Sequence, residues 1–321
     1  MGDQRTLGVI GTLVWDQILT AEPKCDSYEE WGGISYAIAA LSASLPENWK
    51  ILPIIKLGLD LSAEGRSFLD KIPRVDCSQI AVVPEDNNHV QLQYSPDGSR
   101  IERLSGGVPG WSWSELAPLA KICDALYVNF ISGFEMDLQT TETLRREFPG
   151  PIYADLHSLF LGVTSDGMRI PTRLKCWEAW FRCFDAVQMN ESESELLCSQ
   201  EKLLDFSIEP SSLSPSLIVV TLGGQGAEYF TTRGFDEPRW KSMDSPKEAI
   251  ASYKRVALAS GPYAGDPTGC GDVWGATAFA RLLAGDELEK AIRKANELAS
   301  ENVGKRGAKN LLRYLQGKLS Y

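Results

Sequence analysis

Apolar runs and amphipathic stretches alternate along most of the chain. Residues 6–16 (TLGVIGTLVWD) and residues 49–58 (WKILPIIKLG) are apolar and contain β-branched side chains, which is typical of strands covered on both faces. Residues 32–45 (GGISYAIAALSASL) predict an alanine-rich helix, and residues 60–72 (DLSAEGRSFLDKI) predict an amphipathic helix. This order of strand, helix, strand and helix predicts a parallel sheet with crossover helices.

The order is interrupted between Cys77 and Leu104. Polar and apolar residues alternate in this segment, and PEDNN and PDG are turn signals, so we expect short antiparallel strands with one solvent-facing side. We interpret this insertion as a small β-sheet that lies beside the main fold as a lid.

After the insertion the alternation resumes. The predicted strands are residues 124–131, 151–156, 185–190 and 216–224, followed by a hairpin at 226–234 and a short strand at 253–260. The predicted helices are residues 138–148, 172–184, 193–206, 272–284 and 288–303, and a short piece after Gly307. We therefore predict a single three-layer α/β/α domain over residues 1–321, with a mostly parallel central sheet and a lid sub-domain from about 17–31 and 77–104.

The composition excludes some classes of function. With 43% hydrophobic and 23% charged residues, the chain resembles soluble globular proteins rather than disordered ones. A formal net charge of −11 argues against a sequence-independent nucleic-acid binder, because such a protein needs a basic face for the phosphates. A nucleotide ligand is still allowed, because a helix N-terminus and backbone N–H groups bind phosphate without net positive charge.

Cysteine usage and the N-terminal residues predict a cytoplasmic protein. The seven cysteines are scattered and form no C-x-x-C pair, and His89 and His157 are the two histidines, so the sequence argues against a zinc site and for reduced thiols. MGDQRTLGVIG has neither a basic leader nor an apolar core, and no run of about 18 apolar residues occurs, so we expect no secretory signal and no membrane span.

Residues 265–283 (GDPTGCGDVWGATAFARLL) join a glycine-punctuated acidic turn to an apolar helix pattern. Glycines let the backbone turn with its N–H groups facing one point, and a helix that begins at Asp272 adds the positive end of its dipole. Such a point would stabilise the charge on a transferring phosphoryl group, and Asp272 could take the proton of an attacking hydroxyl. An ordinary cap explains the stretch equally well, because Asp is a preferred N-cap residue. The stretch alone leaves both hypotheses open.

Two other phosphate-binding motifs are not supported. The sequence contains no G-x-x-x-x-G-K-[ST], so it does not predict P-loop chemistry. Gly269, Gly271 and Gly275 are spaced somewhat like a dinucleotide fingerprint, but that turn should follow the first strand and lead into a further strand. Here helices close the chain, so an NAD-dependent dehydrogenase is a distant alternative.

The stretch DPTGCGDVWGA is similar to the C-terminal signature of the ribokinase-like, or PfkB, family of carbohydrate and nucleoside kinases. Further matching pieces follow the order of that family across nearly all 321 residues. They are an early strand ending in Asp16, the pair Gly32 and Gly33, GLDLSAEG, the lid-like insertion, NESE at 190–193, VTLGGQGAEYF and the helix KANELASENVGKRGA. The resemblance implies a kinase that transfers the γ-phosphoryl group of ATP to an alcohol group of a sugar or nucleoside, expected to be a hydroxymethyl group.

The same resemblance implies roles for residues at the donor side. Asp272 matches the catalytic base, and the amides of Gly269, Cys270 and Gly271 match the anion hole. The implied cofactors are ATP and Mg²⁺, with a monovalent cation as a further one that the sequence does not specify.

Asn190 and Glu193 match the N-x-x-E motif, which organises Mg²⁺ and the nucleotide phosphates, with Glu193 acting partly through water. Other positions that match the nucleotide site are Thr221, Gly223, Gly226 and Asn296. On the residues alone, Glu193 is better explained as a solvated first-turn glutamate, and the glycines would form a plain hairpin turn in any case.

At the acceptor side, Asp16 matches the carboxylate that binds sugar hydroxyls, and Gly32 and Gly33 match the glycine pair that the substrate approaches closely. The position where the family often has a substrate-binding asparagine is Ala37, so the resemblance leaves the acceptor unspecified. We also consider Asn129 and Arg103 as acceptor contacts.

Aromatic residues surround the acceptor motifs. Trp15, Trp31 and Tyr36 could form a wall against an apolar face of the substrate, or they could be core residues. The expected partners are a small-molecule acceptor and a second copy of the chain that associates through the lid, with no nucleic acid and no membrane. A protein that keeps this fold and binds sugar or nucleotide without catalysis is the main alternative, against which the intact G-x-G-D argues.

Overall fold

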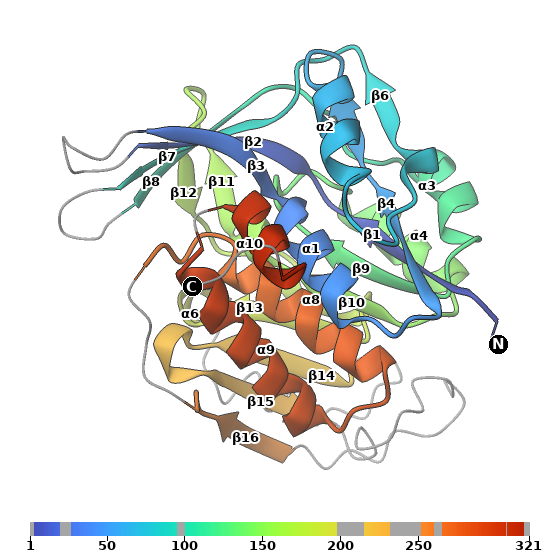
Figure 1. Cartoon of the computed structure of the whole chain (residues 1–321), viewed down its shortest axis with the longest axis vertical. Helices are drawn as coiled ribbons and strands as arrows, with labels where there is room; N and C mark the ends of the chain where they lie inside the picture. Colours follow the sequence, from blue (N-terminus) through green and yellow to red (C-terminus); the bar gives the residue numbers. More distant parts are fainter. Residues whose placement is uncertain are drawn as a thin grey trace.

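The computed structural model describes residues 3–19, 27–94, 100–197, 215–231, 252–259, 265–305 and 307–317. Its largest sheet has eight strands in the order β16-β15-β14-β13-β10-β9-β1-β4 (Figure 1). Their bounds are β1 (Arg5–Ile10), β4 (Trp49–Ile54), β9 (Ala125–Asn129), β10 (Ile152–Asp155), β13 (Ala186–Asn190), β14 (Leu217–Thr221), β15 (Ala227–Thr231) and β16 (Ser252–Val256). All neighbours from β4 to β14 are parallel, whereas β15 and β16 are added antiparallel. The predicted α/β fold with a mostly parallel central sheet is confirmed.

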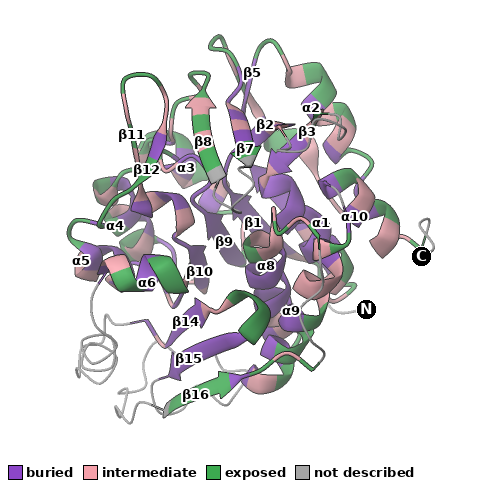
Figure 2. Cartoon of the chain, turned by 90° about the vertical axis from the view of Figure 1, so that its left-hand side faces the viewer, coloured by how far each residue is buried: buried purple, intermediate pink, exposed green. Residues whose placement is uncertain are grey.

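Helices cover both faces of this sheet. One layer contains α1 (Ile34–Ser44), α8 (Cys270–Leu283), α9 (Leu288–Val303) and α10 (Ala308–Leu315), which lie in front of the sheet in Figure 1. The other layer contains α3 (Trp113–Ala120), α4 (Leu138–Glu147), α5 (Trp177–Arg182) and α6 (Glu191–Leu197). Because side chains alternate along a strand, Tyr127 and Tyr153 pack toward α8, while Leu126 and Val128 pack toward the other layer. Figure 2 shows these central strands buried and the edge strand β16 largely exposed.

A second, four-stranded sheet has the order β3-β2-β7-β8 and is mixed, because β2 and β7 are parallel and the other pairs are antiparallel. Its strands are β2 (Leu13–Leu19), β3 (Tyr28–Gly33), β7 (His89–Tyr94) and β8 (Arg100–Ser105). Val14, Ile18, Val90 and Leu92 form a small apolar cluster with Ile131, which joins this sheet to the loop after β9. These strands overlap residues 17–31 and 77–104, for which a lid was predicted, but β2 begins earlier, at Leu13, and β3 ends later, at Gly33. The lid role stays a prediction.

Smaller elements complete the described chain. They are β5 (Lys56–Gly58) with β6 (Ala81–Val83), β11 (Leu161–Val163) with β12 (Arg169–Pro171), the helix α2 (Ser62–Leu69), and the short 3₁₀ helices η1 (Cys77–Gln79), η2 (His157–Phe160) and η3 (Gly223–Gln225). The pair β5–β6 is parallel, so the insertion is antiparallel only in β7–β8. Residues 198–206, 232–234 and 260, which belong to the predicted helix, hairpin and last short strand, lie outside the described residues.

The apolar run at residues 6–16 forms two strands instead of one. The chain leaves the central sheet after Ile10 and joins the lid sheet at Leu13. At the crossing, the Thr12 hydroxyl donates to Glu135 Oε1 at 2.7 Å, and the Thr12 carbonyl accepts the N–H of Ile34 at 3.1 Å. Both strands are buried, so hydrophobicity continues through the crossing and gives no sign of it. Residues 49–58 divide in the same way at Ile55.

The edge strand β3 carries a buried carboxyl group. Glu30 Oε1 has no hydrogen-bond partner. Burial raises the pKa of Glu30 from 4.5 to about 7, with the charge of Lys309 opposing the rise and the charge of Asp266 adding to it. Between these two pH values the folded protein holds a proton that the unfolded chain has released. The stabilising contribution of Glu30 is therefore complete below pH 4.5 and is lost as the pH rises through about 7.

We predict that Glu30→Gln, which keeps the shape of the neutral acid and cannot ionise, is more stable than the wild type at about pH 8 and similar to it at about pH 5. Thermal unfolding across this range measures the difference. Glu64→Gln, an exposed change on α2, is the matched control and should follow the wild type. An unchanged pH dependence in Glu30→Gln would contradict the assignment.

Candidate functional site

The start of α8 lies at the carboxyl ends of the central strands. Gly269, the N-cap residue, has φ 75°, a left-handed conformation that favours glycine, and α8 begins at Cys270 with Asp272 in its first turn. Asp266 fixes the preceding turn, because its Oδ1 accepts the Thr268 N–H at 2.9 Å and the Thr268 hydroxyl at 2.6 Å. The N–H of Cys270 donates to the Pro267 carbonyl at 3.1 Å. The Cys270 N–H is therefore used within the turn, whereas the N–H groups that follow it in the first turn of α8 lack intrahelical acceptors.

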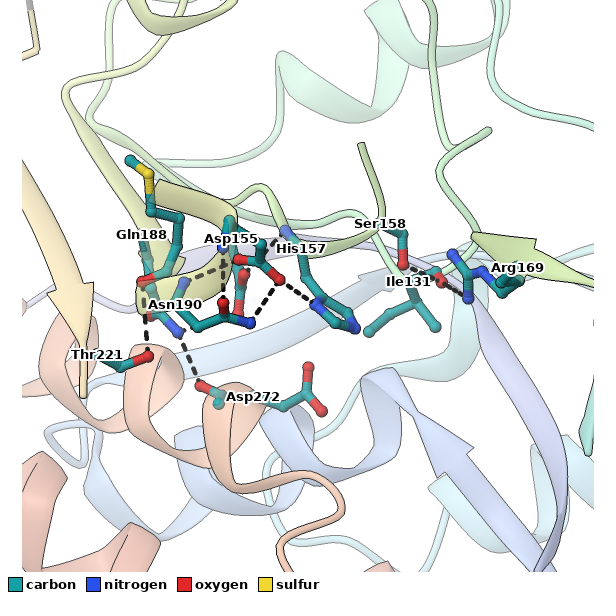
Figure 3. Close-up of polar contacts among 12 residues, drawn as sticks. Ile131, Asp155, His157, Ser158, Arg169, Gln188, Asn190, Thr221 and Asp272 are labelled. Carbon is teal, nitrogen blue, oxygen red and sulfur yellow. Dashed lines mark hydrogen bonds and ion pairs between the residues drawn. The ribbon is translucent and has the colours of Figure 1, made fainter. Parts of the chain in front are cut away.

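A row of polar side chains faces this helix start from the sheet. Asn129 and Asp155 end β9 and β10, and Gln188, inside β13, is the neighbour of Asp155 in register. The Asn129 amide donates to Asp272 Oδ1 at 2.6 Å, and the Gln188 amide donates to the Gly271 carbonyl at 3.0 Å and to Asp155 Oδ2 at 3.0 Å. Figure 3 shows Asp155 and Gln188 above the start of α8, with the Asp272 carboxylate directed toward the space beneath His157. The sequence-predicted residues Asp272 and Asn129 are thus brought together.

The predicted N-x-x-E pair forms a reciprocal contact at the start of α6. The Asn190 N–H donates to Glu193 Oε2 at 2.8 Å, and the Glu193 N–H donates to Asn190 Oδ1 at 2.9 Å. Glu193 Oε1 receives the Asn190 side-chain amide at 2.7 Å and lies 2.6 Å from His157 Nδ1 (Figure 3). Glu193 is buried, at 6% exposure, so it is not the solvated glutamate that the sequence allowed.

Like charges concentrate around these residues. Burial raises the pKa of Asp155 from 3.8 to about 8, and the charges of Asp272 and Glu193 add to the rise while that of His157 opposes it. Burial lowers the pKa of His157, but the contact with Glu193 and the charge of Asp155 outweigh it and raise the value from 6.5 to about 9. At neutral pH these raised pKa values favour a neutral Asp155 and a positively charged His157 ring beside Glu193.

Sequence reasoning did not single out Asp155, His157 or Gln188. The sequence contains a weak indication of a site role for Asp155 and for Gln188, the two that lie on strands. Asp155 closes an apolar strand at its carboxyl end, where α/β sheets place ligand groups, and Gln188 is a polar residue inside the buried run AVQMN. His157, two residues beyond the end of β10, has no sequence pattern that connects it with Glu193.

On the acceptor side, Asp16 and Gly32 lie against each other on β2 and β3. Asp16 is buried, at 4% exposure, and a Cβ added to Gly32 would lie 1.6 Å from Asp16 Oδ2. Gly33 caps α1, and the ring of Tyr36 in the first turn of α1 lies against Gly269, where an added Cβ would come within 2.4 Å of it. The lid strands, α1 and the start of α8 therefore meet at one place.

Other predicted residues lie apart from this place. Trp15 and Trp31 form an edge-to-face pair with ring centroids 5.0 Å apart, on the side of β2 and β3 opposite Asp16. They line an open hollow of about 880 Å³ with residues of α2 and α10. Arg103 is exposed, forms an ion pair of 2.7 Å with Asp166, and lies on the face of β8 opposite Leu104 of the apolar cluster.

The predicted nucleotide positions fall into two groups. Thr221 ends β14. Gly223 begins η3 and Gly226 follows it, with the Leu222 N–H donating to the Gly226 carbonyl at 2.8 Å. Asn296 is buried between α8, α9 and β16. Its Oδ1 accepts the Trp274 indole N–H at 2.7 Å, and its amide donates to the Val256 carbonyl at 3.2 Å. The structure therefore uses both polar atoms of Asn296 within the protein.

In the part of the chain that the structure describes, no helix is both long enough and apolar enough to cross a membrane. The described residues also include no group of three or more His, Cys, Asp and Glu side chains arranged to hold a metal ion directly.

Comparisons with known proteins agree with the geometry. Residues 165–313 match the family model described as pfkB family carbohydrate kinase, and no curated protein sequence matches the chain. Among solved structures, the fold is similar to a pyrophosphate-dependent kinase in the ribokinase family in complex with sulfate, at 18% identity over 98% of this chain and 100% of that chain, with a TM-score of 0.73.

The matches to two further solved structures cover 98% of this chain and 99% of the matched chain. These structures are the Burkholderia thailandensis nucleoside kinase in complex with inosine, at 16% identity and a TM-score of 0.69, and the ribokinase of Thermotoga maritima, at 17% identity and a TM-score of 0.68. At these identities the structural matches speak for the fold, and the family model speaks for the C-terminal half in which the α8 motif lies. Together they show a ribokinase-like fold over nearly the whole chain and a match to the pfkB family of carbohydrate kinases over residues 165–313.

Proposed function

We propose that this protein transfers the γ-phosphoryl group of Mg²⁺-bound ATP to the hydroxymethyl group of a sugar or nucleoside. One observation carries the proposal: Asp272 lies in the first turn of α8 and receives the Asn129 amide at 2.6 Å, at the place where the lid strands, α1 and the central strands meet. An ordinary cap would not need a buried amide from a strand 143 residues away to hold its carboxylate.

Asp272 is the proposed general base. Its carboxylate would accept the proton of the acceptor hydroxyl as that oxygen attacks phosphorus, and Asn129 would keep the carboxylate in one orientation. The positive end of the α8 dipole, with the amides of the turn that follows Gly269, would stabilise the charge on the transferring group. Because phosphoryl transfer needs positioning and charge stabilisation more than covalent chemistry, these groups suffice for the protein's part in the reaction.

Magnesium fits the donor side of this site. When bound, Mg²⁺ would neutralise charge on the donor phosphates. Glu193 is the proposed protein ligand through water, because a carboxylate that already accepts hydrogen bonds from Asn190 and His157 still has lone pairs for a bound water. The raised pKa of Asp155, with Asp272 and Glu193 close by, marks a place where a cation would relieve repulsion between carboxylates.

Asp16, Gly32, Gly33 and Asn129 are the proposed acceptor contacts. Asp16 is a buried carboxylate on the lid sheet, and the absence of a side chain at Gly32 leaves room for it. Arg103 is not included, because it points to the opposite face of β8 and pairs with Asp166. The apolar cluster around Val90 and Ile131 would give the acceptor one apolar side, which suits a nucleoside as well as a sugar.

Pyrophosphate is the second candidate for the donor. Asn296, which the resemblance placed in the nucleotide site, has both polar atoms bonded within the protein. A structural neighbour of this chain is a pyrophosphate-dependent kinase. A donor without an adenine would need only the phosphate-binding part of the site, formed by α8, the Asn190–Glu193 pair and the turn after Thr221.

Replacement of the base tests the proposal directly. Asp272→Asn should bind Mg²⁺ and the donor about as well as the wild type, yet turn over at least about 100-fold more slowly, because it cannot accept the proton. A coupled assay of product release measures turnover. Asp137→Asn is the matched control, since Asp137 caps α4 and Asn is an equally good cap. Turnover within a few-fold of the wild type in Asp272→Asn would contradict the role of the base.

A donor and acceptor screen separates the candidates. Sugars, polyols and nucleosides would be tested with Mg²⁺ and either ATP or pyrophosphate, with release of ADP or orthophosphate as the signal. We expect turnover with ATP, and chelation of Mg²⁺ by EDTA should abolish it. Turnover with pyrophosphate alone would overturn the choice of ATP. Binding of acceptor or nucleotide without turnover of any pair would favour a non-catalytic binding protein.

A further inference from the structure

A glutamine lies in the buried part of a central strand. Gln188 is 2% exposed and belongs to β13, where its neighbours along the strand, Val187 and Met189, pack into the core on the other face of the sheet. A buried amide is costly unless its donors and acceptor are satisfied. Here the Gln188 Oε1 accepts the Tyr153 hydroxyl at 2.9 Å, and its Nε2 donates to the Gly271 carbonyl and to Asp155 Oδ2, both at 3.0 Å (Figure 3 shows the bonds of Nε2).

The hydrogen bond that Gln188 donates to the Gly271 carbonyl also affects the direction of the next N–H in the chain. In a trans peptide the carbonyl and the N–H point in opposite directions. The carbonyl of Gly271 and the N–H of Asp272 belong to one peptide, so a bond that draws the carbonyl toward the sheet directs the N–H away from it. That N–H lies in the turn of α8 where the transferring phosphoryl group is proposed to bind.

Gln188 also determines how closely α8 approaches the sheet. A Cβ added to Gly275, one turn along the helix, would lie 2.2 Å from Gln188 Oε1 and 2.8 Å from the Tyr127 hydroxyl. The helix therefore rests on these polar atoms, and Gly275 is the residue that allows the contact. A change in the bonding of Gln188 would alter the position of the first turn of α8 against the strand ends.

The same glutamine connects α8 with the donor side. Asp155, which receives one of its bonds, accepts the backbone N–H of His157 at 3.2 Å, and the His157 ring lies 2.6 Å from Glu193. A series of hydrogen bonds through Gln188, Asp155 and His157 thus connects the Gly271 carbonyl with Glu193, the carboxylate that is proposed to organise Mg²⁺.

We propose that Gln188 is a positioning residue for phosphoryl transfer: by holding the Gly271 carbonyl, it orients the first-turn amides of α8 toward the transferring group and fixes them relative to Glu193. This inference rests on the proposed function for its reaction. Gln188 itself touches no reacting atom. Its loss should therefore affect the transition state more than donor binding, which other groups provide.

The test uses two variants of similar size in the full-length protein. Gln188→Met removes the hydrogen bonds, and Gln188→Glu replaces the donor by a second acceptor facing Gly271 and Asp155. With Mg·ATP, and with water or the best acceptor of the screen, kcat should fall between about tenfold and about 100-fold in both variants, while the KM for ATP changes less than about threefold.

Two controls separate positioning from general loss of stability. Phe279→Leu weakens the packing of α8 on Tyr127 and Tyr153 away from its first turn and should lower the melting temperature with little change in kcat. Tyr153→Phe removes the bond that orients Gln188 and should lower kcat by a smaller factor. Because Tyr153 acts through Gln188, the double variant Tyr153→Phe/Gln188→Met should be no slower than Gln188→Met alone.

Binding of inorganic orthophosphate, measured by calorimetry without donor or acceptor, gives a readout that does not depend on turnover. We expect binding by the wild type to be at least about tenfold tighter than by Gln188→Met. If that difference is found and no acceptor is phosphorylated, the proposed function fails while the positioning role stands. Equal phosphate affinity, no phosphate binding by the wild type, or a kcat loss matched by Phe279→Leu would overturn the role of Gln188.

Discussion

The contact between the first turn of α8 and the polar ends of the central strands is the constraint on which the rest of the site depends. A helix that packs on a parallel sheet normally does so through apolar side chains, as α8 does further along at Phe279. At its first turn it rests instead on Asn129 and Gln188, which donate to Asp272 and Gly271. Buried polar groups tolerate little displacement, because each lost bond leaves an unsatisfied group. The contact therefore determines where the Asp272 carboxylate, the proposed base, and the first-turn amides of α8 can lie.

Electrostatic repulsion explains why side-chain amides and a buried acid, rather than further ionised side chains, face the first turn of α8. The chain carries a formal net charge of −11, and Asp155, Asp272 and Glu193 lie close enough for their charges to affect one another. The raised pKa of Asp155 keeps it neutral near pH 7, and the raised pKa of His157 supplies a positive charge beside Glu193. Asn129 and Gln188 are neutral donors that add no further charge. The acidic net charge therefore does not conflict with the proposed phosphate site, because local donors rather than net charge would face the anion.

The lid sheet meets this site through small residues and one apolar cluster. Asp16 lies over Gly32, and the ring of Tyr36 lies over Gly269, so a glycine allows each close approach. The cluster that includes Ile131 connects the lid strands with the loop after β9. The aromatic pair Trp15 and Trp31 faces the other side, toward α2 and α10. The proposed acceptor site is thus bounded by a carboxylate, backbone and aliphatic side chains, and not by the tryptophans that surround its motifs in the sequence.

The sequence by itself determined the order of most strands and helices and the position of the glycine-rich turn before α8, because apolar periodicity and glycine spacing are local properties of the chain. It did not show that residues 6–16 cross between two sheets, since the residues on both sides of the crossing are buried. Only the tertiary structure decided that Asn296 is used internally, that Arg103 faces away, and that Gln188 and His157 belong to the site. These outcomes depend on which face of a strand a residue occupies and on hydrogen bonds between distant segments. One such bond joins Gln188 to Gly271, which are 83 residues apart in the sequence. A local sequence pattern cannot predict such bonds, because they form only when the folded sheet brings its strands next to the helix.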